Sequence, residues 1–226
     1  MLVNSDLNSR QHLSISLLTL DTLEEDLVNY FDEKATIGTI INQIVLNHRP
    51  MDIAQDYPKT ERQSFKIYLN KAVKDILSEI EYDDLEYNNI GRYIRTVIEE
   101  YIRMPIYKRE RILFKDEIDR YNIELESEDR CILLLKSGGM QFDFKIYRIS
   151  EEGESNYNYL IGLSRRHGTN DKYVPASFRL SRVTFVKRLS RKTYGSGKIS
   201  KENRIAIDKK LKFSGVDFLV GDIYKI

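Results

Sequence analysis

Two arginines, Arg179 and Arg182, lie three residues apart in the segment SFRLSRV, residues 177–183. Phe178 and Leu180 alternate there with polar residues, which is the period-two pattern of a half-buried strand. Strict alternation would put Arg182 on the apolar side, so the strand bulges or ends there, or Arg182 lies at an edge. A guanidinium binds a carboxylate or a phosphate through paired N–H donors. The segment alone leaves both an internal ion pair and a phosphate site open.

Charge is distributed unevenly along the 226 residues, although the net charge is only +1. Residues 1–144 carry 18 Lys and Arg against 27 Asp and Glu, whereas residues 145–226 carry 18 against 8. A dense basic region beside an acidic one indicates a polyanionic partner, usually nucleic acid. The alternative is that the two halves neutralise each other across an interface.

Several classes of protein do not fit the composition. No apolar run approaches the ~18 residues of a membrane span, and the first residues lack a signal-peptide pattern. The single cysteine, Cys131, cannot form an intrachain disulfide or a cysteine-cluster metal site. His12, His48 and His167 lie far apart in the sequence, none has metal-ligand spacing, and no nucleophile stands with a base. We therefore expect a cytoplasmic protein that is not an enzyme and has no metal, cofactor or membrane segment.

The first half contains a repeated pattern, in residues 13–50 and again in residues 65–105. Each copy begins with an alternating strand, continues with an amphipathic helix and a polar turn, and ends with a second helix. Thr36 and Asn89 stand at the N-cap positions expected for the second helices. Residues 1–106 are therefore predicted to form two strand–helix–helix repeats.

Strand–helix–helix repeats of this kind resemble the ribbon-helix-helix fold, in which two strands pair into one antiparallel ribbon. The resemblance implies that outward ribbon side chains read the DNA major groove and that the second helices hold phosphates at their N-termini. The outward positions here are Ser14, Ser16, Lys66 and Tyr68. The alternative, favoured by the acidic balance of residues 1–144, is that the ribbon only assembles the domain.

The second half has three predicted parts. Residues 107–129 are charged with apolar residues at helical spacing, which predicts a connecting helix. Residues 130–190 contain short apolar or alternating segments between Gly, Asn, Asp and Ser turns, which is typical of a small antiparallel barrel or sandwich. Residues 191–226 form a short basic extension.

Two motifs in the predicted barrel, NYLIG at residues 158–162 and FRLSRV at residues 178–183, resemble the WYL domain. The usual pattern of that family is Trp-Tyr-Leu-x-Gly followed, after a variable loop, by Phe-Arg-Leu-x-Arg-Ile. This chain departs from the pattern at Asn158, in place of Trp, and at Val183, in place of Ile. The resemblance covers residues from about 109 to about 190. It implies an Sm-like or SH3-like antiparallel barrel that binds nucleic acid or nucleotide-like ligands.

The resemblance also implies a binding surface. In the family, the two arginines matched by Arg179 and Arg182 line a ligand-facing surface beside the tyrosine matched by Tyr159. Tyrosine faces stack on unpaired bases while arginines bind phosphates, which suits RNA. The further residues that we expect in this surface are Tyr147, Arg165, Arg166 and Lys172. The alternatives are an internal ion pair for Arg182 and a core position for Tyr159.

The order of the parts resembles the WYL accessory proteins of type VI-D CRISPR loci, most clearly over residues from about 60 to about 190. This resemblance implies an α+β protein that binds single-stranded RNA and stimulates an RNA-guided RNA nuclease. One alternative is a transcriptional regulator that binds duplex DNA through Lys66 and Tyr68 and senses a ligand with its barrel. Another is a module that only docks on a protein. A type VI CRISPR nuclease and a second copy of the chain are further candidate partners.

Overall fold

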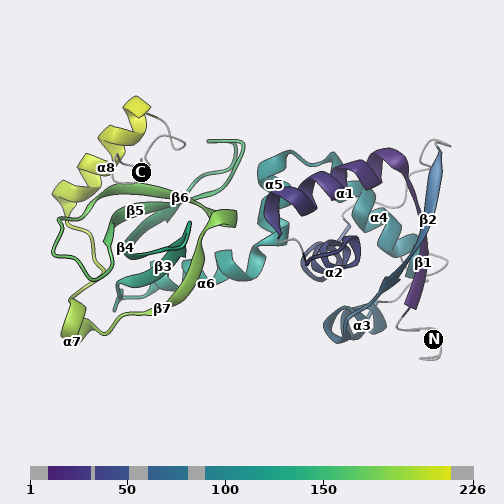
Figure 1. Cartoon of the computed structure of the whole chain (residues 1–226), viewed down its shortest axis with the longest axis horizontal. Helices are drawn as coiled ribbons and strands as arrows, with labels where there is room; N and C mark the ends of the chain where they lie inside the picture. Colours follow the sequence, from purple (N-terminus) through teal and green to yellow (C-terminus); the bar gives the residue numbers. More distant parts are fainter. Residues whose placement is uncertain (1–9, 32–33, 51–60, 81–89, 215–226) are drawn as a thin grey trace. The chain divides into compact units, whose positions relative to one another are not determined.

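The structure, a computed structural model, describes residues 10–31, 34–50, 61–80 and 90–214. The chain divides into two compact units, Met1–Pro105 and Ile106–Ile226 (Figure 1). The fold class is mixed α+β, as the sequence predicts. Among the described residues, no helix is long and apolar enough to span a membrane.

The first unit contains the order strand–helix–helix twice. The elements are β1 (Arg10–Ser16), α1 (Leu17–Tyr30), α2 (Ile37–Asn47), β2 (Arg62–Tyr68), α3 (Lys71–Ser78) and α4 (Ile90–Arg103). β1 and β2 pair antiparallel into a two-stranded ribbon. This order and pairing match the predicted pattern, while membership of the ribbon-helix-helix family stays a prediction.

The ribbon has one buried face. Leu13 and Ile15 of β1 and Ile67 of β2 are buried, because alternate residues of a strand point to the same side. Asn42 of α2 holds the end of β2 in place: its amide Nδ2 donates to the Tyr68 carbonyl at 2.8 Å, and its Oδ1 accepts from the Asn70 N–H at 2.9 Å. Because Leu13, Ile15 and Ile67 point inward, the residues that alternate with them lie on the outer face of the ribbon.

Side-chain caps define where the helices of the first unit begin. The Ser16 hydroxyl accepts from the Thr19 N–H at 3.1 Å, and the Asn70 side chain accepts from the Val73 N–H at 2.8 Å. Thr36 caps α2 in a reciprocal capping box with Thr39, which confirms that predicted N-cap. The other predicted cap, Asn89, lies outside the described residues.

The second unit is built around a five-stranded antiparallel sheet in the order β6-β5-β4-β3-β7. Its elements are α5 (Ile106–Leu113), α6 (Lys115–Glu126), β3 (Leu133–Ser137), β4 (Met140–Ile149), β5 (Tyr159–Arg166), β6 (Val174–Arg179), the 3-10 turn η1 (Leu180–Arg182), β7 (Thr184–Arg188), α7 (Arg191–Tyr194) and α8 (Lys201–Ser214). The predicted connecting helix is thus two helices, separated at Phe114. The described strands form an open sheet, so closure into a barrel is not confirmed.

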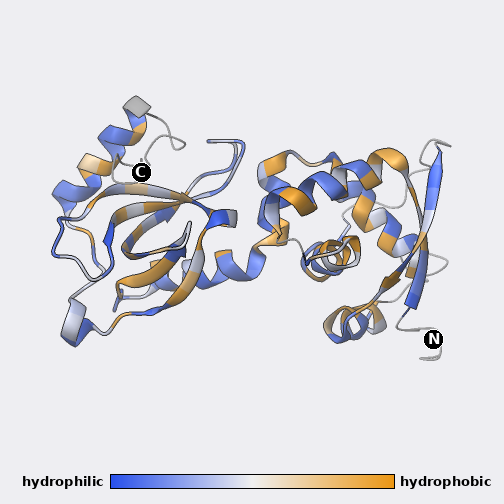
Figure 2. Cartoon of the chain, viewed as in Figure 1, coloured by the Kyte–Doolittle hydropathy of each residue, from blue (hydrophilic) through white to orange (hydrophobic). Residues whose placement is uncertain are grey.

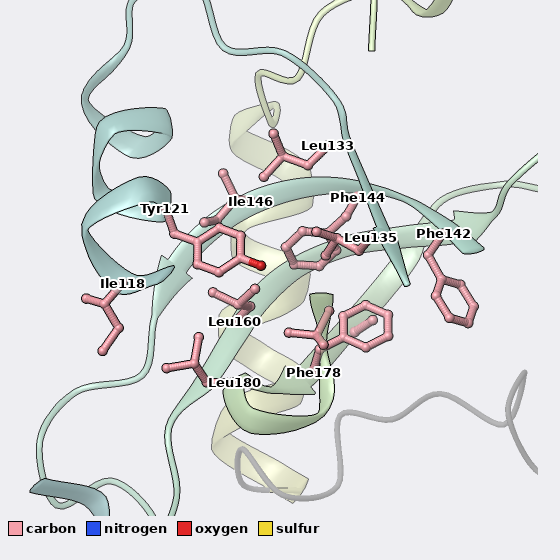
Figure 3. Packing of buried hydrophobic residues seen from close by; sticks show 12 residues of the cluster. Ile118, Tyr121, Leu133, Leu135, Phe142, Phe144, Ile146, Leu160, Phe178 and Leu180 are labelled. Carbon is pink, nitrogen blue, oxygen red and sulfur yellow. The ribbon is translucent and has the colours of Figure 1, made fainter. Parts of the chain in front are cut away.

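One face of this sheet carries the larger core of the unit. Ile118 and Tyr121 of α6 pack there on apolar residues of the strands (Figure 3). The labelled strand and turn residues in this cluster are Leu133, Leu135, Phe142, Phe144, Ile146, Leu160, Phe178 and Leu180. Phe178 and Leu180, which flank Arg179 in the sequence, therefore point into the core as their alternation predicts.

Gly162 of the NYLIG segment is required by packing between strands. A Cβ atom at this position would lie 2.1 Å from the Lys145 carbonyl oxygen of β4 and 2.8 Å from Phe144 Cζ. Any larger residue would push the two strands apart, which explains the glycine. The β4–β5 register shifts nearby, between Ile146 and Arg148.

Candidate nucleic-acid interface

The exposed face of the β1–β2 ribbon, which we call the ribbon face, has an unusual composition. Its eight residues are Arg10, His12, Ser14, Ser16, Arg62, Ser64, Lys66 and Tyr68. None of the eight is a carboxylate, although residues 1–105 as a whole carry 18 Asp and Glu against 11 Lys and Arg. Figure 2 shows the first part of β2 in hydrophilic colours. The ribbon face is therefore a basic stripe on an acidic unit, which favours an anionic ligand.

One end of the ribbon face combines a cation with an aromatic ring. Arg10 lies opposite Tyr68 in the ribbon register, and its guanidinium carbon is 5.3 Å from the centroid of the Tyr68 ring. Tyr68 is 62% exposed, so one side of a large ring remains open to a ligand. On the same face, the next pair of opposite residues is His12 and Lys66.

An open pocket of about 630 Å³ adjoins this end, where α2 begins. Its walls include Lys66 and Tyr68 from the ribbon and Thr36, Thr39 and Gln43 from the start of α2. The two predicted ribbon residues therefore lie beside hydroxyl groups and a helix N-terminus. Such a setting is compatible with a phosphate group.

The opposite end of the ribbon face brings arginines together. Arg62 lies opposite Ser16 and near Arg92 and Arg95 of α4. Burial lowers the pKa of Arg95, and the positive charges of Arg62 and Arg92 lower it further. Among the described residues, Arg95 Nε is buried without a hydrogen-bond partner. Arginine charges thus act on one another at this end of the ribbon, and the nearby Glu99 carboxylate opposes them by raising the pKa of Arg95.

The sequence prediction had missed the arginines of the ribbon face. Arg10 and Arg62 could have been found by extending the alternation of Leu13 and Phe65 outward along each strand. Arg92 and Arg95 carry no such signal, because only the folded repeat brings α4 close to the start of β2.

The motif residues Tyr159 and Arg179 lie next to each other, as the resemblance implies, because they are register partners in the β5–β6 pair. Tyr159 is only 8% exposed. It packs with Ile161 of β5 and with Ile199 and Ile207, the latter from α8. The tyrosine therefore occupies the core position that the sequence left open as an alternative, and its role in RNA binding stays a prediction.

Arg179 participates in an internal ion pair. Its Nε lies 3.7 Å from Oε1 of Glu110, a carboxylate on α5 with 0% exposed side chain. Its guanidinium carbon also lies 3.4 Å from the centroid of the Tyr157 ring. The ion pair that the sequence left open for Arg182 is thus formed by Arg179.

Asn158, which stands where the family has Trp, connects α5 with the sheet. Its backbone N–H and its Nδ2 both donate to Oε2 of Glu110, at 2.6 and 2.9 Å. Nδ2 also donates to the Tyr107 carbonyl at 2.8 Å. Its Oδ1 accepts from Arg111 Nε at 2.8 Å, and Arg111 donates in turn to the Ser150 carbonyl at 2.8 Å. Asn158 is 1% exposed, so this polar network lies inside the protein.

Arg182 lies apart from the β5–β6 pair. Strand β6 ends at Arg179, and residues 180–182 form the turn η1. Arg182 is exposed, and its carbonyl accepts from the Ser137 hydroxyl of β3 at 2.9 Å. The break in alternation therefore marks the end of a strand, which was one of the outcomes that the sequence left open.

A second group of cations surrounds the end of β5. Arg165 Nε donates to Oδ2 of the buried Asp143 at 2.9 Å, and His167 Nδ1 hydrogen-bonds Oδ1 of the same carboxylate at 2.5 Å. The Arg165 guanidinium carbon and the Lys145 Nζ each lie 4.7 Å from the Tyr173 ring centroid. Burial lowers the pKa of Lys145, as does the charge of Arg165, and burial raises the pKa of Tyr173 to about 12.

The predicted residues Arg166 and Lys172 are both exposed, one at the end of β5 and the other in the loop that follows it. The remaining predicted residue, Tyr147, is half-buried on β4, and its hydroxyl donates to Asp208 of α8 at 3.1 Å. Of the predicted site residues in the second unit, Arg166, Lys172 and Arg182 are thus exposed, and Arg165 and Arg179 pair with carboxylates. Tyr147 and Tyr159 belong to the cluster under α8. Among the described residues, no three His, Cys, Asp or Glu side chains could together hold a metal ion.

Comparison with known proteins finds similarity among solved structures. No protein-family model and no curated protein matches the chain. A solved structure described as "Crystal structure of a CRISPR Cas-related protein" is similar with a TM-score of 0.68 at 17% sequence identity. The similarity covers 92% of this chain and 72% of that one. At this identity the likeness establishes a shared fold.

Proposed function

We propose that this protein binds nucleic acid and serves as an accessory protein of a CRISPR system. The observation that carries nucleic-acid binding is the ribbon face, where exposed cations and a tyrosine lie together without a carboxylate. The CRISPR context is supported by the similar structure described as a CRISPR Cas-related protein. The resemblance to the WYL accessory proteins of type VI-D loci supports stimulation of an RNA-guided RNA nuclease.

Single-stranded RNA is the ligand that we propose. Unpaired bases offer faces for tyrosine stacking, and the adjoining phosphates offer partners for lysine and arginine. Tyr68 with Arg10 and Lys66 supplies this combination on the ribbon face. Arg166 and Lys172 supply further exposed cations in the second unit.

Duplex DNA is the second candidate ligand, and the shape of the ribbon favours it. A two-stranded ribbon fits the DNA major groove, and the pocket between Lys66 and the start of α2 suits a backbone phosphate. If duplex DNA is the ligand, the protein is a DNA-binding transcriptional regulator whose second unit senses a small ligand. Loss of duplex binding in Lys66→Ala and Tyr68→Ala, with RNA binding weak throughout, would favour it.

A polarisation titration with one labelled sequence, prepared as single-stranded RNA, single-stranded DNA and duplex DNA, separates the two candidates. We expect the tightest binding to single-stranded RNA. Tightest binding to duplex DNA would replace the accessory function with the regulatory one, and weak binding to all three would contradict both. Arg179→Ala is unsuitable as a probe because it leaves the buried Glu110 carboxylate without its cation.

Nuclease stimulation requires its own experiment. A guide-loaded type VI-D nuclease and a fluorescent reporter RNA are mixed with the wild type or with Arg62→Ala/Lys66→Ala. We expect the wild type to raise the cleavage rate and the double variant to lose most of that increase. An unchanged rate at saturating wild-type protein would contradict the accessory function while leaving nucleic-acid binding intact.

A further inference from the structure

The helix α8 lies against the sheet through apolar side chains and a hydrogen bond in its described part, residues 201–212. Of its side chains, Ile207 is buried and Leu211 is partly buried in the cluster that also contains Ile199. The Tyr147 hydroxyl of β4 donates a hydrogen bond to Asp208 of the helix. The helix is mostly hydrophilic in Figure 2, and residues 201–206 are all exposed. Over residues 201–212 the buried apolar surface of the helix is thus small, and elements with little buried apolar surface open at low cost in free energy.

Beneath α8 lies a sheet surface rich in tyrosine, which we call the tyrosine face. It consists of Tyr147, Tyr157, Tyr159 and Tyr173 around Ile161 and Leu163. Cations lie at its margin: Arg179 stacks on Tyr157, and Lys145 and Arg165 stack on Tyr173. Rings that can stack on bases beside cations that can bind phosphates are the features of a single-strand binding surface.

The tyrosine face is separate from the larger core of the unit. Phe142, Phe144 and Phe178 pack with α6 on the opposite face of the sheet, and none of them belongs to the cluster under α8. The sheet therefore keeps its main apolar contacts when α8 leaves. This separation allows α8 to detach without unfolding the unit.

We propose that α8 is a displaceable cover and that single-stranded RNA takes its place on the tyrosine face. This inference rests on the proposed function, because it gives the RNA a second site beyond the ribbon. Bases stack where Ile207 and Leu211 now pack, and phosphates bind at the margin beside Lys145. Binding is then reduced by the fraction of molecules in which α8 is closed.

The charges of α8 determine which variant can test whether RNA and α8 compete for the tyrosine face. Its exposed side includes Lys201, Arg204, Lys209 and Lys212, which attract RNA wherever the helix lies. Deleting α8 would remove the cover and the attraction together. Ile207→Ser weakens the docking contact and leaves every charge in place. Ile205→Ser is the matched control because Ile205 is 59% exposed on the same helix.

The first experiment compares RNA affinities. If α8 covers the face about nine-tenths of the time, release raises the apparent affinity about tenfold. We expect Ile207→Ser to bind single-stranded RNA about tenfold more tightly than the wild type, and Ile205→Ser to match the wild type. Leu211→Ser, a milder change, should give an intermediate gain with retained folding. Equal or weaker binding by both folded docking variants would overturn the proposal.

Hydrogen exchange provides a second readout that does not depend on the variants. Saturating RNA should speed the exchange of amides in residues 204–212 and slow that of β4 and β5. Unchanged or slower exchange of α8 would overturn displacement. If the wild type binds RNA but the hydrogen exchange of α8 does not change, α8 is not displaced and the proposed function stands. If neither the wild type nor the docking variants bind RNA, the proposed function fails and this inference fails with it.

Discussion

At the scale of single residues, Asn158 explains how the second unit accommodates a departure from the motif that it resembles. An asparagine side chain can donate through Nδ2 and accept through Oδ1 at the same time, whereas an indole can only donate. Asn158 uses both functions, toward Glu110 and Tyr107 on one side and toward Arg111 on the other. A Trp at this position could not accept the hydrogen bond that Arg111 Nε donates to Oδ1.

We predict that Asn158→Ala destabilises the second unit by about 1–3 kcal/mol, because it removes the Nδ2 donor to the buried Glu110 and the Oδ1 acceptor of Arg111. The backbone N–H of residue 158 still donates to Glu110 in this variant. Urea unfolding followed by circular dichroism measures the change. Asn156→Ala, at an exposed position in the same loop, is the control and should change stability by less than about 0.5 kcal/mol. Equal stabilities of the two variants would show that the network contributes little.

The arginines illustrate what the sequence could predict about single residues. Alternation correctly predicted that Phe178 and Leu180 point inward and that Arg179 does not. It could not predict that Arg179 pairs with Glu110, because that carboxylate lies 69 positions earlier on another element. Long-range partners of this kind depend on how elements pack and leave no local pattern.

At the scale of elements, the ribbon and its helices were the most predictable part. Strands and helices were evident from periodicities of two and of about 3.6 residues, and Thr36 was evident as a cap. The break at Phe114 and the docking of α8 were not predicted. The apolar residues of α8 that face the sheet, Ile207 and Leu211, are too few to distinguish a docked helix from a basic tail.

The connection between β4 and β5 contains an ion pair with a pH signature. Arg148 contacts both carboxylate oxygens of Glu154 at 2.8 Å. This hydrogen bonding from Arg148 is the main cause that lowers the pKa of Glu154. A carboxyl group whose pKa is lower in the folded state stabilises the fold above its unfolded pKa, about 4.3 for Glu. That stability is lost as the pH falls through the folded pKa.

We predict that Glu154→Gln lowers stability by about 0.5–1 kcal/mol at pH 7, the range of partly exposed ion pairs, and by much less at pH 3. Thermal unfolding at the two pH values measures the difference. Glu152→Gln, at an exposed neighbouring position, serves as the control and should show no pH-dependent difference. A Glu154→Gln effect that persists at pH 3 would contradict an ionic origin.

At the scale of the whole molecule, charge is divided between the units. Residues 1–105 carry 11 Lys and Arg against 18 Asp and Glu, whereas residues 106–226 carry 25 against 17. The sequence suggested that the acidic half would only assemble the ribbon. The structure instead places three of the 11 Lys and Arg of residues 1–105 on the ribbon face, where no carboxylate lies. Net charge could not predict this arrangement because it averages over a surface.

We predict that RNA binding at the ribbon needs one chain only, because β1 and β2 of the same chain already form the ribbon. Titrations at several protein concentrations should fit a single-site isotherm with a Hill coefficient of about 1. A homodimer, which stays a candidate assembly from the sequence analysis, would then leave ribbon affinity unchanged. A steeper isotherm that weakens on dilution would contradict this prediction.

The measurement that tests the account most directly is the salt dependence of single-stranded RNA binding by the wild type, Arg62→Ala/Lys66→Ala and a control, Lys108→Ala. Each phosphate contact on a single strand contributes about −0.7 to the slope of log K against log salt. We predict that the double variant loses about 1.4 from the magnitude of the slope and that the control, an exposed lysine on α5, keeps the wild-type slope. Equal slopes for all three proteins would contradict the ribbon face as a nucleic-acid interface.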